Sequence, residues 1–191
     1  MNEAKNILLV GVGGQGTILA SKILTSGLIE AGYDVKMSEI HGMSQRGGSV
    51  STQVRYGDEV LSPIVGKGSA DVIVAFEKME ALRWLPYLKV GGKMVINDFE
   101  INPVPVNLGK ADYPTDIIAE LKSKASVLSF KAGEIAEGLG NSKAMNVVLL
   151  GALVKAIGGL DDVDWMKQVE ANVKPKFIDL NKEAFKAGYN L

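Results

Sequence analysis

A glycine-rich turn that follows an apolar segment places the strongest constraint on the fold of this chain. Residues 6–10 form a nearly continuous apolar run, which predicts a strand buried on both faces of a parallel sheet. Gly11, Gly13 and Gly16 follow with the spacing G-x-G-x-x-G, and apolar residues then recur at helical spacing over residues 19–31. A strand, a glycine turn and a helix in this order predict the first βα unit of an α/β fold.

The turn itself, which also contains Gly14 and Gln15, predicts a position that binds an anion. Glycine lacks a Cβ and tolerates positive φ, so backbone N–H groups in the turn can approach a ligand closely. The start of the helix adds unpaired N–H groups and a partial positive charge, which suit a phosphate or a carboxylate. The alternative is a tight turn that binds nothing, because a fold does not by itself imply a function.

The rest of the chain alternates between strand patterns and helical patterns. This alternation predicts an α/β fold, a Rossmann-like three-layer sandwich with a mostly parallel sheet and a C-terminal helical cap. We interpret residues 1–191 as a single domain, because the length suits one buried core and no linker or internal repeat interrupts it. The predicted strands are 34–40, 50–56, 71–76, 93–97 and 126–130, and the predicted helices are 77–85, 117–124, 145–157, 165–173 and 177–187.

Three local features of the sequence predict further details of the fold. Residues 50–56 alternate between apolar and polar side chains, which favours a hairpin with residues 60–61. Residues 104–107 lie in a proline-rich stretch and are interpreted as a short edge strand. Gly151 lies in the middle of a predicted helix, where glycine costs about 1 kcal/mol relative to alanine. We therefore expect another backbone to pack closely against Gly151.

The composition limits the classes of function. The chain has 191 residues, a formal net charge of −1 and 47% hydrophobic residues, which is typical of a globular protein. Balanced charge without basic clusters gives no reason to expect nucleic acid or an anionic membrane as a partner. No apolar run approaches the roughly 18 residues of a membrane span, and no secretory signal is evident, so we expect a cytoplasmic protein. The absence of cysteine excludes thiolate nucleophiles and cysteine-ligated metal clusters in this chain.

A second glycine-rich segment, residues 41–49, has no strand or helix periodicity and is predicted to be a binding or docking loop. Arg46 can bind a carboxylate or a phosphate through two parallel hydrogen bonds. Gly47 and Gly48 would let backbone N–H groups contribute, and His41 is the single histidine of the chain. The alternative is a structural role for Arg46 and a surface position for His41.

No complete catalytic set is visible in the sequence, which suggests that the chain works with another subunit. A free-standing NAD(P)-binding oxidoreductase of the Rossmann type is the alternative function. A dinucleotide site also requires an acidic residue about 20 positions after the glycine turn, and Glu39 is placed for that role. Gln15 argues against this alternative, because it puts an amide where dinucleotide folds usually have a small or apolar residue.

The two glycine-rich motifs together resemble the gamma-type domain of the 2-oxoacid:ferredoxin oxidoreductase family. The form of the second motif resembles the small (beta) subunit of the indolepyruvate:ferredoxin oxidoreductase branch. The resemblance extends over nearly the whole chain. The residues that carry it are Gly11 to Gly16 with Leu19 and Ala20, then Gly42 to Ser49, Val54 and Arg55, and near the end Asn181, Ala184, Phe185, Gly188 and Tyr189.

The resemblance implies a function for the complex and a place for this chain within it. Such enzymes oxidatively decarboxylate a 2-oxoacid with thiamine diphosphate, pass electrons through iron–sulfur clusters to ferredoxin and form an acyl-CoA. In the indolepyruvate branch the large alpha subunit carries the thiamine diphosphate and the clusters, in a heterodimer or heterotetramer. The small subunit would complete the assembly, and the equivalent domain of related enzymes helps to hold coenzyme A.

The residues expected to bind the cofactor follow from the two motifs and from this resemblance. No residue is assigned as a catalytic acid, base or nucleophile, and no metal ligand is expected. The glycine turn would donate main-chain N–H groups and the Gln15 amide, and the second motif would form another wall or contact the large subunit. The assigned residues are Gly11, Gly13, Gly14, Gln15 and Gly16 in the turn, and Ser44, Gln45, Arg46, Gly47 and Gly48 in the second motif.

Overall fold

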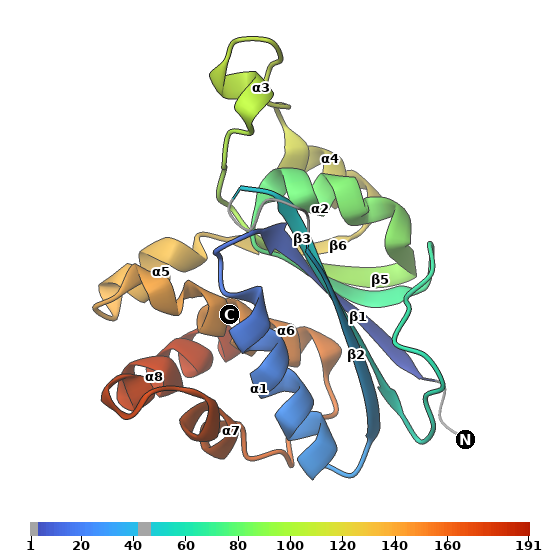
Figure 1. Cartoon of the computed structure of the whole chain (residues 1–191), viewed down its shortest axis with the longest axis vertical. Helices are drawn as coiled ribbons and strands as arrows, with labels where there is room; N and C mark the ends of the chain where they lie inside the picture. Colours follow the sequence, from blue (N-terminus) through green and yellow to red (C-terminus); the bar gives the residue numbers. More distant parts are fainter. Residues whose placement is uncertain (1–3, 42–46) are drawn as a thin grey trace.

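A six-stranded sheet forms the centre of the molecule (Figure 1). The structure is a computed structural model and describes residues 4–41 and 47–191. The strands lie in the order β2-β3-β1-β4-β5-β6. They are β1 (Lys5–Val12), β2 (Asp34–His41), β3 (Ser49–Gly57), β4 (Ala70–Ala75), β5 (Leu88–Asn97) and β6 (Ser126–Phe130). The strand segments predicted from apolar patterning are therefore confirmed, and they form an α/β fold.

The sheet is mostly parallel, as predicted. Strands β1, β4, β5 and β6 pair in parallel, whereas β3 is antiparallel to both β1 and β2. Strand β2 therefore runs in the same direction as β1, and β3 is the one described strand that runs the opposite way. From β1 the chain continues to β2, which lies on one side of β1 in the sheet, whereas from β4 it continues to β5, which lies on the opposite side. This reversal puts a topological switch point between β1 and β4, where open α/β sheets bind ligands.

Helices cover both faces of the sheet, which confirms the predicted three layers (Figure 1). Helices α2 (Lys78–Trp84) and α4 (Ile117–Lys124) pack on one face. The other face carries α1 and the C-terminal helices, which form the predicted helical cap. These are α1 (Thr17–Glu30), α5 (Ala132–Gly138), α6 (Met145–Ile157), α7 (Trp165–Asn172) and α8 (Ile178–Tyr189). The remaining elements are α3 (Val104–Asn107) and the short 3-10 helices η1 (Leu85–Tyr87), η2 (Ser142–Ala144) and η3 (Pro175–Phe177).

The apolar run of β1 explains why its strand lies at the centre. Ile7 and Leu9 belong to the core beneath α1 and α6, while Leu8 and Val10 belong to the core beneath α2 and α4. All four side chains are fully buried. Complete burial of such a side chain contributes roughly 1.5–3 kcal/mol, so each face of the strand is stabilised independently. None of the helices within residues 4–41 and 47–191 combines the length and the apolar character of a membrane span.

The predicted close backbone packing at Gly151 is confirmed. A Cβ at this position would lie 2.1 Å from the carbonyl oxygen of Phe185 on α8. Gly188 on α8 faces the same crossing, and a Cβ there would lie 1.8 Å from the carbonyl oxygen of Val148 on α6. Helices α6 and α8 therefore approach one another through a pair of glycines.

Two local predictions are wrong. Residues 50–56 form no hairpin with residues 60–61, because β3 is inserted between β1 and β2 and both its edges are already paired. Residues 58–69 instead cross one face of the sheet without strand structure, and the Gln53 side chain accepts a hydrogen bond from the Val65 N–H at 2.6 Å. Residues 104–107 form the short helix α3 rather than an edge strand.

Candidate functional site

The carboxyl ends of β1, β4 and β5 meet at one edge of the sheet, on either side of the switch point. The glycine turn follows β1 here, with Gly16 as the residue before α1. Phe76 and Glu77 follow β4, and the Phe76 N–H donates to the carbonyl of Val10 at 2.8 Å. Asn97 ends β5 at the same edge. The predicted cofactor-binding turn therefore lies where a doubly wound sheet offers a ligand site.

Backbone geometry explains the glycines of the turn. Gly14 and Gly16 have φ values of 103° and 82°, which side chains other than glycine rarely adopt. A Cβ on Gly16 would also lie 2.5 Å from the Nδ2 atom of Asn146 on α6. A Cβ on Gly11 would lie 2.9 Å from the Cβ atom of Phe76. Gly14 differs from the others, because a Cβ there would meet no atom within 4 Å.

The side chain of Gln15 links the two strands at the switch point. Its Oε1 atom accepts a hydrogen bond from the Val12 N–H at 2.8 Å. Its Nε2 atom donates to the carbonyl of Phe76 at 2.8 Å, which joins the end of β1 to the end of β4. Both ends of this buried amide are engaged within the protein. The structure thus gives Gln15 a positioning role, and the ligand-donor role expected from the sequence stays a prediction.

Replacing Gln15 by leucine should destabilise the fold by about 1–3 kcal/mol, because the Val12 N–H would lose its buried acceptor and the Phe76 carbonyl would keep only the longer bond from Asn97. Chemical denaturation of the isolated chain measures this loss. A Gln15→Glu variant keeps the acceptor for Val12 but places a buried carboxylate oxygen against the Phe76 carbonyl, so a loss at least as large as that of the leucine variant is expected. Unchanged stability in both variants would contradict the positioning role.

Few main-chain donors of the turn remain for a ligand. The Gly13 N–H donates to the carbonyl of Gly48 at 2.9 Å, and the Gln15 N–H donates to the carbonyl of Val12 at 3.2 Å. Within the described part of the chain, the N–H groups of Gly14 and Gly16 have no acceptor. The first turn of α1 adds further unpaired N–H groups, as every helix start does. The anion-binding capacity of the turn therefore centres on Gly14, Gly16 and the start of α1.

The structure brings the two glycine motifs together. The hydrogen bond between Gly13 and Gly48 joins them directly. A hollow of about 430 Å³ lies between the turn and the ends of β2 and β3, lined by Gly13, Gly14, Gly16, Thr17, Ile18, His41 and Val50. Gly47 has a φ of 79° and comes three residues before Val50, which lines this hollow. The predicted site residues Ser44, Gln45 and Arg46 lie outside the described residues.

A second groove of about 580 Å³ lies on the other side of the turn, toward α6. Its lining combines polar groups of the turn and of η2 with apolar side chains: Gly14, Gln15, Gly16, Asn97, Phe99, Ile101, Gly133, Ser142, Lys143, Met145 and Asn146. The glycine turn is thus accessible from two sides, with His41 near one and Lys143 near the other.

Two asparagines that the sequence reasoning missed hold this groove in shape. Asn97 donates to the carbonyl of Phe76 at 3.1 Å and accepts from the Ala132 N–H at 2.9 Å. Asn146 donates to the carbonyl of Gly16 at 3.2 Å, while its buried Oδ1 atom has no hydrogen-bond partner among the described residues. The sequence signal was a single amide beside each of two apolar runs: Asn97 follows residues 94–96, and Asn146 precedes residues 147–150.

Two buried carboxylates near the edge have structural partners. Glu77 accepts from the Glu80 N–H at 3.0 Å and from the Ile101 N–H at 3.3 Å, and the Tyr113 hydroxyl donates to it. Burial, followed by this bond to Glu77, raises the pKa of Tyr113 above its usual value. Glu80 accepts from Arg83 at 3.0 Å and from the Ser49 hydroxyl at 2.5 Å. Both carboxylates therefore hold local structure, and neither is positioned as a free acid or base.

The placement of Glu39 does not suit a dinucleotide site. Glu39 lies on the edge strand β2 and is paired in register with Thr52 of β3, which separates it from β1. In dinucleotide-binding folds the strand that carries this acid lies directly beside β1. The Glu39 carboxylate lies 3.5 Å from the Nε2 atom of His41 instead. In residues 4–41 and 47–191, no group of three or more histidine or acidic side chains could hold a metal ion.

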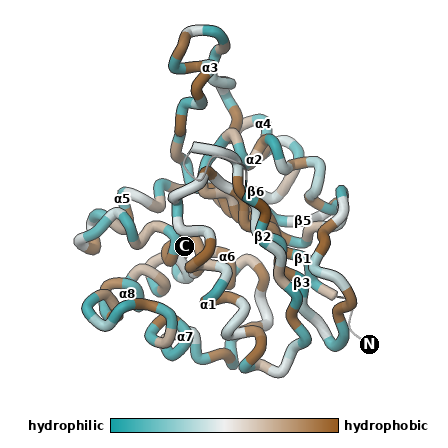
Figure 2. The backbone as a smooth tube through the Cα atoms, in the orientation of Figure 1, coloured by the Kyte–Doolittle hydropathy of each residue, from teal (hydrophilic) through white to brown (hydrophobic). Residues whose placement is uncertain are grey.

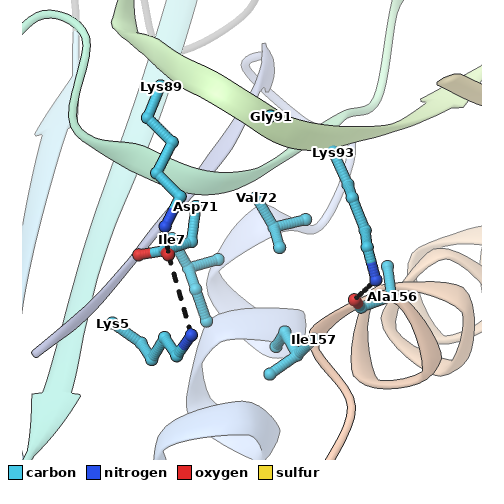
Figure 3. Close-up of a pocket in the computed structure, with 9 residues that line it drawn as sticks. All are labelled: Lys5, Ile7, Asp71, Val72, Lys89, Gly91, Lys93, Ala156 and Ile157. Carbon is cyan, nitrogen blue, oxygen red and sulfur yellow. Dashed lines mark hydrogen bonds and ion pairs between the residues drawn. The ribbon is translucent and has the colours of Figure 1, made fainter. Parts of the chain in front are cut away.

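A smaller pocket of about 180 Å³ lies at the opposite edge, where β1, β4 and β5 begin (Figure 3). Its charged side chains all have partners within the protein. Lys5 lies 3.9 Å from the Asp71 carboxylate, and Lys89 also contacts Asp71. Lys93 donates to the carbonyl of Ala156, near the end of α6, at 2.8 Å. These contacts favour a structural role for this edge and leave the glycine edge as the candidate site.

Comparison with known proteins shows which family this chain resembles in sequence and in fold. The chain is 43% identical over 188 residues to the indolepyruvate oxidoreductase subunit IorB of Pyrococcus horikoshii, covering 96% of this chain and 93% of that protein. The gamma subunit of a keto/oxoacid ferredoxin oxidoreductase from Geobacter sulfurreducens has a similar structure, with a TM-score of 0.71 and 25% identity over 97% of this chain and 96% of that chain.

A 2-oxoglutarate:ferredoxin oxidoreductase from Magnetococcus marinus, solved with 2-oxoglutarate, coenzyme A and succinyl-CoA bound, contains the same fold. Its TM-score is 0.76 at 20% identity, and the match covers all of this chain but 31% of that chain. The sequence model of the pyruvate ferredoxin/flavodoxin oxidoreductase family matches residues 6–191. The motifs, the fold and these matches agree, and the chain belongs to the pyruvate ferredoxin/flavodoxin oxidoreductase family.

Proposed function

We propose that this chain is the small subunit of an enzyme that oxidatively decarboxylates arylpyruvates such as indolepyruvate to aryl-acetyl-CoA, with ferredoxin as electron acceptor. The observation that carries the proposal is the 43% identity to an indolepyruvate oxidoreductase subunit over nearly the full length of both chains. In each turnover the bond to the carboxylate breaks, carbon dioxide leaves, two electrons go to ferredoxin, and the acyl group is transferred to the sulfur of coenzyme A.

The cofactors of this reaction are assigned to a large alpha subunit. The present chain has no cysteine and therefore offers no thiolate for an iron–sulfur cluster. Its buried carboxylates Glu77 and Glu80 are engaged in structural bonds. Thiamine diphosphate and the clusters accordingly belong to the partner, and ferredoxin is reached through the complex. We propose a heterodimer or heterotetramer in the cytoplasm, with residues 1–191 as one gamma-type domain.

The contribution of this chain is to hold an anionic part of coenzyme A at the glycine edge. The N–H groups of Gly14 and Gly16 and the start of α1 are suited to a phosphate. Gln15 keeps this turn in place, and Gly11 allows the close approach to Phe76 on which that placement depends. Ser44, Gln45 and Arg46, together with Gly47 and Gly48, would form the second wall or contact the large subunit.

A Gly14→Ala variant tests the coenzyme A site. Alanine at a φ of 103° is strained by about 1–2 kcal/mol, and its methyl group would occupy the open space in which the phosphate is proposed to lie. The KM for coenzyme A in the assembled enzyme should rise about 10-fold, which corresponds to the loss of one charge-assisted hydrogen bond. The KM for the 2-oxoacid should remain unchanged.

Gly68→Ala is the matched control. Gly68 also has a positive φ, 71°, a Cβ there would meet no atom within 4 Å, and it lies near the opposite edge of the sheet. The Gly68→Ala variant should lose similar stability without a change in the KM for coenzyme A. Equal effects of the two variants on that KM would contradict a coenzyme A site at the turn.

A further inference from the structure

The segment between β5 and α4 projects away from the body of the protein (Figure 1). Its outer part, residues 99–112, is called the arm here and contains the short helix α3. Neither hydrophobic core includes a residue of the arm. Val104 and Leu108 are nevertheless 69% and 62% exposed, and Figure 2 shows hydrophobic positions along the arm. The arm therefore presents apolar side chains that contribute little to the fold.

The base of the arm is fixed rather than loosely attached. The buried carboxylate of Glu77 accepts hydrogen bonds from the Ile101 N–H and from the hydroxyl of Tyr113, so it joins the outgoing and returning sides of the arm. The carbonyl of Phe99 accepts from the Lys78 N–H at 3.0 Å. A buried acid that holds both sides of a projecting segment presents its tip in a defined position. Such preorganisation lowers the entropic cost of binding a partner.

The tip has the chemistry of a protein-binding element. The Leu108 N–H donates to the carbonyl of Val104 at 3.0 Å, so the two side chains lie one helical turn apart on the same face. Residues 101–109 contain no charged side chain, and two prolines stiffen them. An uncharged tip has no electrostatic attraction for nucleic acid or an anionic surface. Two aliphatic side chains on one face suit an apolar groove on another protein.

We propose that the arm docks into an apolar groove on the large subunit of the same enzyme, with Val104 and Leu108 as its anchors. This proposal rests on the proposed function, because it requires that a large subunit exists. Phe99 and Ile101 at the base of the arm also line the groove beside Gly14 and Gly16. The base of the arm thus borders the glycine edge, so a chain that binds both the tip and this groove would complete the site.

The occupant is a different chain rather than a second copy. In the Magnetococcus marinus enzyme the same fold accounts for 31% of a longer chain, so there it is joined to additional polypeptide of the same enzyme. By contrast, the Pyrococcus horikoshii relative, 93% of which this chain covers, is named as a subunit. A docking arm would supply by non-covalent contact the association that a longer chain provides by covalent linkage.

The test is a Val104→Asp/Leu108→Asp double variant, measured for binding to the purified large subunit by biolayer interferometry. Burying two carboxylates in an apolar groove should weaken the affinity about 100-fold or more. The thermal unfolding midpoint of the isolated chain should stay unchanged, because both side chains lie outside the cores. Val90→Asp is the matched control: Val90 is fully exposed near the opposite edge, and its variant should bind like the wild type.

The possible outcomes separate the docking role of the arm from the proposed function. Wild-type binding with equal affinity in the double variant would overturn the docking role of the arm and leave the proposed function intact. Wild-type dimerisation that the double variant abolishes, without a change in affinity for the large subunit, would assign the arm to a second copy and also overturn the proposal. If the wild-type chain fails to bind the large subunit, the proposed function fails and the arm's docking role fails with it.

Discussion

Replacing Gly188 by alanine is expected to destabilise the isolated chain by about 3 kcal/mol or more, the upper end of the usual cost of overpacking a core. The methyl group would lie 1.8 Å from the carbonyl oxygen of Val148, which cannot move without bending α6. Gly151→Ala should have a comparable effect, because its methyl group would lie 2.1 Å from the carbonyl oxygen of Phe185. Chemical denaturation followed by circular dichroism measures both losses.

Gly138→Ala provides the control for these variants. Gly138 is also in a helix, α5, but a Cβ there would meet no atom within 4 Å. Alanine should therefore be neutral or stabilise by up to about 1 kcal/mol through its higher helix propensity. The double variant Gly151→Ala/Gly188→Ala should lose less stability than the sum of the two single variants, because both methyl groups push apart the same pair of helices, α6 and α8. Wild-type stability of Gly188→Ala would show that α6 and α8 do not approach as closely as described.

Local sequence patterns were sufficient to predict most of the elements of the fold. The fully apolar runs at 6–10 and 71–76 give strands buried on both faces, and residues 117–124 and 126–130 match their helix and strand. Gly151 was also interpretable, since an internal helix glycine needs a compensating contact. Patterns of this kind are local, and each one records which side of an element is buried.

Predictions failed where distant segments decide the structure. Residues 50–56 have the alternation of a hairpin strand, but their partners are β1 and β2 rather than the next segment along the chain. The Val-Pro-Val pattern at 104–107 resembles an edge strand, yet no neighbouring strand pairs with it in the described sheet and it forms a helical turn. Helix α5 was missed because its seven residues carry little apolar periodicity.

At the candidate site, too, local features were predictable from the sequence and contacts between distant segments were not. The place of the turn between a strand and a helix was predictable from the G-x-G-x-x-G spacing, although of the three glycines in that spacing Gly16 alone has a positive φ. The role of Gln15 was not, because its bond to Phe76 spans 61 positions in sequence. Asn146 contacts Gly16 across 130 positions, and no local pattern contains that contact. Sequence therefore located the turn, while the side chains that hold it became visible only in the folded chain.

The isolated chain is expected to show no oxidation of indolepyruvate above background, even with coenzyme A and a viologen acceptor present. It has no cysteine for an electron-transferring cluster. The described residues contain no cluster of ligands for a metal ion, and the carboxylates beside the glycine turn hold local structure. Under the proposed function, the groups for decarboxylation and electron transfer lie on the large subunit.

We conclude that this chain is one subunit of a 2-oxoacid:ferredoxin oxidoreductase, and we propose that the enzyme needs it for activity. The most direct measurement is indolepyruvate-dependent viologen reduction by the small subunit alone, the large subunit alone and a titrated mixture of the two. We expect no coenzyme A-dependent turnover from this chain alone, and turnover that rises with added small subunit and saturates at a fixed ratio. Turnover by this chain alone, or full coenzyme A-dependent turnover by the large subunit without it, would contradict the claim.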